Sequence, residues 1–219
     1  MTTYTDLIKL GDEAIGMGDF ESGLRFYRSA LHDSQGGAEE ASARQCTGIA
    51  LRLKGLLAES EAELINALQI AQPQSILSAR IKRDLGMTIL DRAVKEQTPG
   101  KFDDAEMWFD ESRKALDTAG DPVEAAVSIG FMARSMFLRG DPAAIVVFRN
   151  THKVLKRQNN VYELNNLVWL ARASAVDRWR HAIRVYDLVI LTEHKVRGWE
   201  YCAILVGGNR LYERLRARS

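Results

Sequence analysis

Apolar residues recur at every third or fourth position along most of the chain, which is the spacing of one buried stripe on an α-helix. Leu7, Leu10 and Ala14 form such a stripe, and residues 24–31 form the next one. Between them, the Gly-Met-Gly-Asp stretch at 16–19 combines a helix stop with a helix start. Asn-Gly and Asp-Gly hairpin turns do not occur in the sequence, and β-branched residues do not alternate with polar ones over any useful length. The pattern therefore predicts an all-α protein.

The same periodicity predicts about eleven helices, joined by short turns that place neighbouring helices antiparallel. Their expected ranges are 3–17, 20–34, 38–54, 57–71, 74–95, 102–118, 122–139, 142–157, 161–175, 179–192 and 197–216. Asp-Pro pairs at 121–122 and 141–142 mark two of the starts. Aspartate can cap the first free amides of a helix, and proline lacks only an amide that had no partner.

A repeated arrangement of small and large residues links successive helix pairs. A glycine or alanine in the first helix is followed, in the second helix, by a small residue and a large one four positions later. The copies are Leu10-Gly11 with Gly23-x3-Tyr27, Thr47-Gly48 with Ser60-x3-Leu64, Leu85-Gly86 with Ala105-x3-Phe109, Met132-Ala133 alone, and Leu170-Ala171 with Ala182-x3-Tyr186. In the fourth copy, the second helix is expected to lack the alanine and aromatic pair. Five consecutive copies resemble the tetratricopeptide repeat (TPR).

The resemblance implies an all-α, right-handed superhelical solenoid of antiparallel helix pairs, built as a single domain over residues 1–219. Its repeats are expected near 4–37, 41–73, 75–119, 122–158 and 161–193, with a capping helix at 197–216. In such repeats a small residue lets two helices approach closely, while large residues fill the groove between one pair and the next. We therefore expect Gly48 and Gly86 to lie where two helices cross closely.

The composition is that of a folded protein with a real core, since 46% of the 219 residues are hydrophobic and 27% are charged. The formal net charge of +1 hides an asymmetry along the chain. Residues 1–148 contain 16 basic and 23 acidic side chains, a charge of −7, whereas residues 149–219 contain 14 and 6, a charge of +8. The basic end favours acidic partners, or contacts with the acidic body of a second copy.

The sequence contains no complete motif for catalysis, for metal binding or for insertion into a membrane. Gly16 and Gly18 begin like a dinucleotide-binding fingerprint, but Glu21 stands where the third glycine should be. The histidines are not spaced as metal ligands, and Cys46 is interpreted as a small buried side chain, not a nucleophile. The longest apolar stretch, at 185–191, is interrupted by a tyrosine and an aspartate. We expect no enzyme activity, cofactor, metal or membrane partner, and a cytoplasmic location, since the start lacks a secretory signal.

Proteins that resemble this repeat commonly bind a peptide on a concave surface lined by the first helix of each pair. Projected onto this chain, that surface predicts a peptide-binding site made of Gln45, Ile49, Arg52, Arg80, Arg83, Met87, Arg134, Phe137 and Arg172. Arginine presents a fork of donors that matches carboxylate and phosphate, so an acidic peptide or protein segment is the expected partner. The alternative is that these arginines are solvated or paired with aspartates and glutamates of the same chain.

The function predicted from the sequence is thus that of a non-enzymatic interaction scaffold or adaptor. Two alternatives stay open beside it. One is self-association into a larger assembly, in which the basic end of one copy meets the acidic body of another. The other is binding of RNA or single-stranded nucleic acid, because basic residues such as Lys153, Arg178 and Arg180 have aromatic neighbours such as Trp179.

Overall fold

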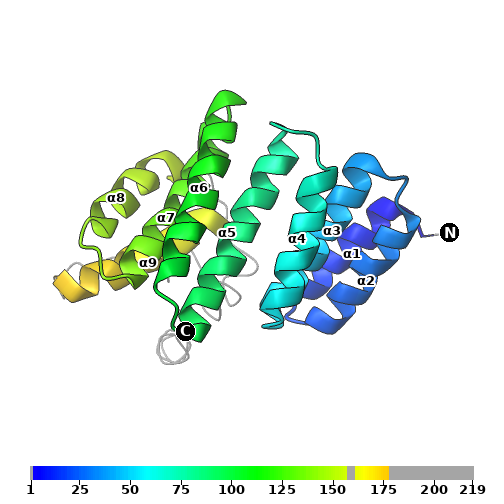
Figure 1. Cartoon of the computed structure of the whole chain (residues 1–219), viewed down its shortest axis with the longest axis horizontal. Coiled ribbons are helices and arrows are strands. Elements are labelled where there is room, and N and C mark those ends of the chain that lie inside the picture. Colours follow the sequence, from blue (N-terminus) through cyan, green and yellow to red (C-terminus); the bar gives the residue numbers. More distant parts are fainter. Residues whose placement is uncertain (1, 157–160, 178–219) are drawn as a thin grey trace. The chain divides into compact units, whose positions relative to one another are not determined.

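The computed structural model describes residues 2–156 and 161–177, and within these ranges the regular structure is entirely α-helical (Figure 1). The helices are α1 (Tyr4–Gly16), α2 (Phe20–Asp33), α3 (Gly37–Leu53), α4 (Leu57–Ile70), α5 (Ile76–Glu96), α6 (Gly100–Thr118), α7 (Pro122–Leu138), α8 (Ala144–Leu155) and α9 (Val161–Asp177). The all-α prediction is confirmed, and each of these helices agrees with its predicted range to within two residues at either end. The helices predicted at 179–192 and 197–216, and the motif at 182–186, lie outside the described residues.

The chain divides into two compact units, Met1–Ser135 and Met136–Ser219, which are described separately. The first unit contains α1 to α6 and most of α7. The second contains the end of α7 together with α8 and α9. That the whole chain is one domain stays a prediction.

The stop and start signals of the sequence act at the helix ends. Thr3 and Asp6 form a capping box at the start of α1, in which the Thr3 hydroxyl oxygen accepts from the Asp6 N–H at 3.2 Å and the Asp6 carboxylate accepts from the Thr3 N–H at 3.0 Å. At the Asp-Pro start of α7, the Asp121 carboxylate accepts from the Glu124 N–H at 3.0 Å. Gly18, in the turn after α1, has a φ of +79°, which only glycine adopts without strain.

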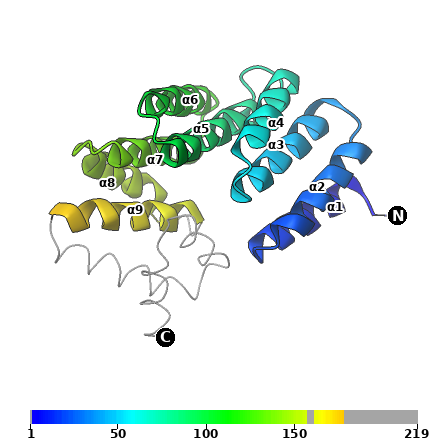
Figure 2. The ribbon, with the colours of Figure 1, turned by 60° about the horizontal axis from the view of Figure 1, so that its bottom comes forward.

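Within Met1–Ser135 the helices pack as successive pairs. α1 packs on α2, α3 on α4 and α5 on α6, while α2 and α4 also pack on the first helix of the next pair. The first helices touch one another, α1 with α3 and α3 with α5, so they form one layer and α2, α4 and α6 form the other (Figure 2). A buried cluster of Ala79, Leu116 and Ala125 joins α7 to α5 and α6.

Each of these three pairs is closed at a glycine in its first helix. A Cβ atom added there would lie far inside van der Waals contact with a large side chain of the second helix. The closest distances are 2.3 Å for Gly11 to Tyr27, 2.7 Å for Gly48 to Leu64 and 2.7 Å for Gly86 to Phe109. The prediction that Gly48 and Gly86 lie at close helix crossings is therefore confirmed, and Gly11 does the same in the first pair.

The fourth pair corrects one expectation from the sequence. α8 does carry the alanine and aromatic pair, because Ala144 and Phe148 are four residues apart on one helix face and are both buried. In the structure Asp141 holds a turn before the helix, accepting from the Ala143 N–H at 2.8 Å and from the Ala144 N–H at 3.2 Å.

In the second unit α8 packs against α9. The Asn166 amide, which is buried, donates to the Phe148 carbonyl oxygen at 3.1 Å and so ties the two helices together. Leu164, Leu167 and Trp169 of α9 are buried as well. The unit is thus held by an apolar contact with a polar tie inside it.

Candidate functional site

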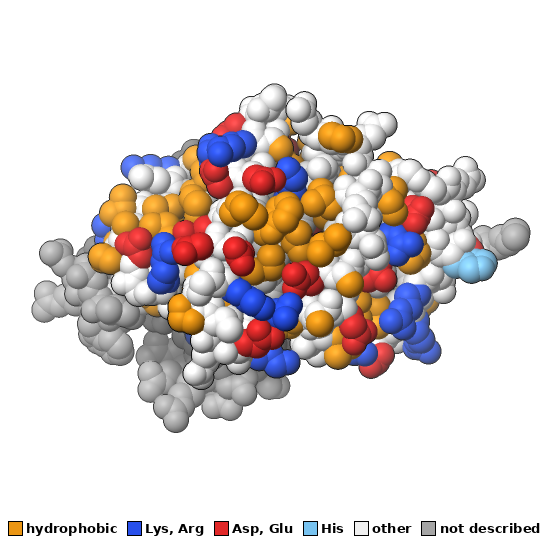
Figure 3. All heavy atoms as spheres, viewed as in Figure 1, with side chains coloured by type: hydrophobic (Ala, Val, Ile, Leu, Met, Phe, Trp, Pro, Cys, Tyr) orange, Lys and Arg blue, Asp and Glu red, His pale blue; other side chains and the backbone are white. Residues whose placement is uncertain are grey.

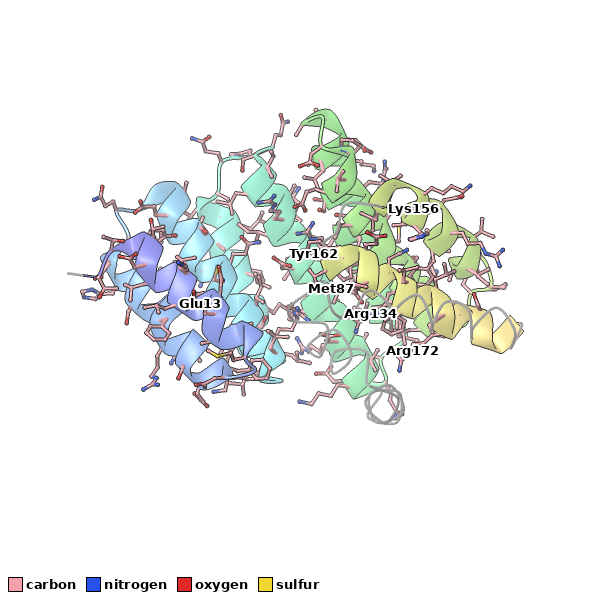
Figure 4. The ribbon with its side chains drawn as sticks, turned by 180° about the vertical axis from the view of Figure 1, so that it is seen from behind. Glu13, Met87, Arg134, Lys156, Tyr162 and Arg172 are labelled. Carbon is pink, nitrogen blue, oxygen red and sulfur yellow. The ribbon has the colours of Figure 1, made fainter. Side chains whose placement is uncertain are left out.

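The predicted site residues of the first unit lie on three successive first helices. α3 contributes Gln45, Ile49 and Arg52, α5 contributes Arg80, Arg83 and Met87, and α7 contributes Arg134. All but Ile49, which is half-buried, are brought together by side-chain contacts that run through acidic residues of α5 and α7 or through the Met87 sulfur. In Figure 4, Met87 and Arg134 lie side by side, and the Arg134 guanidinium approaches the Met87 sulfur to 4.0 Å.

Asp91 on α5 is the first of two carboxylates shared between arginines. Its Oδ2 accepts from Arg52 Nη1 of α3 at 3.0 Å, and its Oδ1 accepts from Arg134 Nη2 of α7 at 2.8 Å. One carboxylate therefore joins the first helices of three successive pairs. Charge-assisted bonds of this kind are stronger than bonds between neutral groups.

Glu124 in the first turn of α7 is the second shared carboxylate. It accepts from Arg80 Nη2 at 2.8 Å through one oxygen and from Arg83 Nη1 through the other. Burial opposes ionisation of this carboxyl group, but the charges and hydrogen bonds of Arg83 and Arg80 outweigh it and hold the pKa of Glu124 below its ordinary value. Glu124 is accordingly an anion at neutral pH.

Asp84 on α5 has a different environment. It is buried, and its Oδ2 accepts from the Gln45 amide of α3 at 2.6 Å. Burial raises the pKa of Asp84, and the favourable contributions of Arg83, Gln45 and Arg52 do not offset it. Gln45 therefore serves as a partner for a carboxyl group inside the chain.

We call the four arginines Arg52, Arg80, Arg83 and Arg134, with the carboxylates Asp91 and Glu124, the arginine layer. The side chains of Arg52, Arg83 and Arg134 are 8%, 4% and 9% exposed, whereas that of Arg80 is 44% exposed. The interpretation that these arginines are paired with acidic residues of the same chain is thus correct for all four. Four arginines thus share two carboxylates, which gathers guanidinium groups from three successive first helices.

The remaining two predicted residues lie in the second unit and contact the same tryptophan. Phe137 meets Trp169 edge to face with ring centroids 5.9 Å apart. The Arg172 guanidinium lies 4.8 Å from the centre of the Trp169 ring, within the range of a cation–π contact. Their membership of one binding site with the residues of α3 and α5 stays a prediction.

The acidic partners of these residues were not predicted, although the sequence contains a signal for them. Gln45 and Asp84 are 39 residues apart, as are Arg52 and Asp91. Gly48 and Gly86, which mark equivalent positions in successive repeats, are 38 residues apart. Residues separated by about one repeat face each other on neighbouring first helices, so complementary residue types at that spacing indicate a direct contact.

The side of the first unit that is formed by the second helices α2, α4 and α6 has a different distribution of charged and apolar side chains. Figure 3 shows apolar side chains gathered over α4 to α6 and bordered by charged side chains of both signs. Some ion pairs here join two helices, as Glu111 of α6 does with Lys82 of α5 at 2.8 Å. Others form within one helix: on α6, Asp110 contacts Arg113 at 2.7 Å and Lys114 at 2.7 Å. The pairs of Asp110 share charge in the manner of the arginine layer but join no helices.

The thiol of Cys46 and the side chains that ligate metals are the other candidates for chemistry. Burial, with smaller contributions from Asp12 and Asp84, raises the pKa of the Cys46 thiol to about 12, so the thiol is neutral at pH 7 and a poor nucleophile. In the part of the chain that the structure describes, no group of three or more His, Cys, Asp or Glu side chains is placed to hold a metal ion. Among the same residues, no helix combines the length and the apolar character needed to cross a bilayer.

No protein-family model and no curated protein match the sequence. Solved structures do match, and they define the class of fold as that of TPR-like repeat proteins, as the sequence motifs predict. RapI in its apo form has a TM-score of 0.67 at 13% identity, covering 98% of this chain and 82% of that one. BtubC (BKLC) from P. vanneervenii has a TM-score of 0.63 at 17% identity, covering 87% and 79%. A putative kinesin light chain with nearly identical TPR-like repeats, from Podosopora anserina, has a TM-score of 0.58 at 12% identity, covering 87% and 95%. At these identities the likeness shows the fold alone.

Proposed function

We propose that the protein is a non-enzymatic interaction scaffold that binds an acidic peptide or protein segment on the arginine layer. The observation that carries the proposal is the sharing of carboxylates. Asp91 and Glu124 are each shared between two arginines, so four guanidinium groups are gathered on neighbouring first helices. TPR-like repeats build extended surfaces of this kind, and such surfaces suit protein partners.

Arg80 is the arginine of this proposed site that an acidic partner contacts first. Its side chain is 44% exposed, and only one of its nitrogens is bonded to Glu124, so the guanidinium fork has donors directed to solvent. A carboxylate of the partner bonded there contributes about 1.5–3 kcal/mol. Ile49, half-buried on α3, adds apolar surface beside the charged groups.

The test uses a short labelled peptide rich in glutamate and its matched glutamine version, titrated with the full chain by fluorescence anisotropy. The glutamate peptide binds, its affinity falls as salt rises because exposed charges are screened, and the glutamine peptide does not bind. Arg80→Gln weakens binding about tenfold, the equivalent of about 1.4 kcal/mol.

The matched control is Arg113→Gln on α6, since Arg113 is also partly exposed and paired with acidic residues. It leaves binding unchanged. An equal loss in both variants means that the peptide responds only to net charge, and the absence of any binding at low salt refutes the proposed function.

Self-association and nucleic-acid binding have no comparable observation in their favour. Both depend on the basic residues after position 148, most of which lie outside the described residues. They stay predictions from the sequence.

A further inference from the structure

We propose that Asp91 occupies the place of the ligand, so that the acidic segment must displace this internal carboxylate to bind fully. The inference rests on the proposed function and adds the regulation of the same site and the charge pattern of the ligand. Asp91 bonds one arginine from each flanking first helix, at 3.0 Å and 2.8 Å. A carboxylate from a partner would need the same donors.

The burial of the three side chains supports this role. Asp91 is 23% exposed, whereas Arg52 and Arg134 are 8% and 9% exposed. The side chain with the carboxylate is therefore more exposed to solvent than the two arginine side chains that it bonds. At the other shared carboxylate the order is the same for Arg83, which is 4% exposed against 17% for Glu124. An approaching anion meets the internal carboxylates before it meets these arginines.

The geometry of α5 sets the spacing of the ligand charges. Arg80, Asp84, Met87 and Asp91 recur at intervals of three and four and so share one face of the helix. Arg80 and Asp91 are eleven positions apart, or roughly 16 Å at 1.5 Å per residue. An extended segment covers that distance in about five residues. The ligand is thus an extended segment with two acidic residues about five positions apart, one bound at Arg80 and the other in place of Asp91.

The experiment measures the affinity of the full chain for two labelled peptides of equal composition. One carries two glutamates five positions apart, and the other carries them adjacent to each other. Asp91→Asn removes the internal charge while keeping the shape of the side chain. We expect it to tighten binding of the spaced peptide about tenfold and to change binding of the adjacent peptide much less.

Asp110→Asn on α6 is the matched control. Asp110 also bonds two cations, so this variant removes the same charge from the same kind of pairing at another place. It leaves both affinities at the wild-type value. If Asp91→Asn does not fold, as shown by circular dichroism, Asp91→Ser replaces it, with the same expected gain because it removes the same charge.

The outcomes separate this inference from the proposed function. If the wild-type chain binds the spaced peptide and the folded variant binds no more tightly, Asp91 is not a competitor and the inference is wrong, while the scaffold proposal stands. An equal gain for both peptides refutes the two-point spacing. If neither wild type nor variant binds either peptide, the proposed function falls and the inference falls with it.

Discussion

The helix crossings of the first unit and its arginine layer stabilise the same helices by different physics. At the crossings, Gly11, Gly48 and Gly86 meet large side chains so closely that a Cβ would lie 2.7 Å or less from them. In the arginine layer, by contrast, α3, α5 and α7 are joined through two shared carboxylates. Adding atoms to a helix crossing disrupts its packing. An ion pair in the arginine layer is lost when one of its two charged side chains is replaced.

This difference between the helix crossings and the arginine layer indicates where side-chain contacts can be exchanged without unfolding the protein. A crossing has no alternative partner, because the space is already filled by the second helix. A shared carboxylate has a built-in alternative, since either arginine can hold it after the other is lost. We therefore expect the crossings to be the rigid part of the unit and the arginine layer to be the part that exchanges partners.

The largest effect is expected from overpacking a crossing. Gly86→Leu places a Cβ 2.7 Å from the Phe109 ring and 3.1 Å from the Ala105 carbonyl oxygen, which is backbone and cannot rotate away. The loss in free energy of unfolding should reach about 3 kcal/mol, measured by urea denaturation. Gly16→Leu is the control, because a Cβ on Gly16 meets no atom within 4 Å. A loss of only a few tenths of a kcal/mol at Gly86 would contradict the crossing.

Removing one cation from the arginine layer comes next. Arg134→Met keeps an unbranched, flexible side chain without the charge but leaves Asp91 with Arg52 alone. We expect a loss of about 1–2 kcal/mol by the same measurement, smaller than at the crossing because the carboxylate keeps one partner. A double-mutant cycle with Asp91→Asn checks the assignment: additive losses would mean that the two side chains do not interact.

Asp84 and Glu124, two carboxyl groups whose pKa values are shifted in opposite directions, should respond to substitution with opposite sign. Burial raises the pKa of Asp84 in the folded state, so its ionised form costs stability at neutral pH and the cost is relieved as the pH falls through the raised pKa. Asp84→Asn should raise the thermal midpoint at pH 7, by less than Arg134→Met lowers it. The difference from wild type should vanish on acidification, and a variant less stable than wild type at pH 7 but equal to it in acid would show that the ionised form is favoured.

Glu124→Gln supplies the counterpart. Arg83 and Arg80 lower the pKa of Glu124 against the effect of burial, so its charge stabilises the fold above the ordinary carboxyl pKa, and this contribution is lost as the pH falls through the lowered value. The variant should be less stable than wild type at pH 7, and the gap should close in acid. Thermal melts across this pH range measure both variants together.

The smallest effect is expected outside both regions. Arg113 on α6 is paired with Asp110 and Asp117 of the same helix, and its side chain is 30% exposed. Pairs of this kind contribute little because solvent screens them. Arg113→Ala should change the free energy of unfolding by about 0.5 kcal/mol or less. A loss as large as that of Arg134→Met would contradict the expectation that ion pairs between helices stabilise the fold more than ion pairs within one helix.

The sequence by itself determined the helices and the way they close into pairs. The spacing of apolar residues and the stop and start signals placed α1 to α9 to within two residues, because both are local properties of a helix. Gly48 and Gly86 marked the crossings, since a small residue at a fixed repeat position has a steric reason to be there. The register of the fourth pair was less exact, because the turn at Asp141 delays the start of α8 to Ala144.

Only the tertiary structure decided the electrostatics of the candidate site. The sequence placed Arg52, Arg83 and Arg134 on first helices, but their burial and their partners depend on residues about one repeat away in the chain. Whether an arginine is free for a ligand or bonded to its own chain is a matter of a few ångströms between side chains. Helical periodicity determines the face on which a residue lies, and the packing of neighbouring helices determines what it meets there.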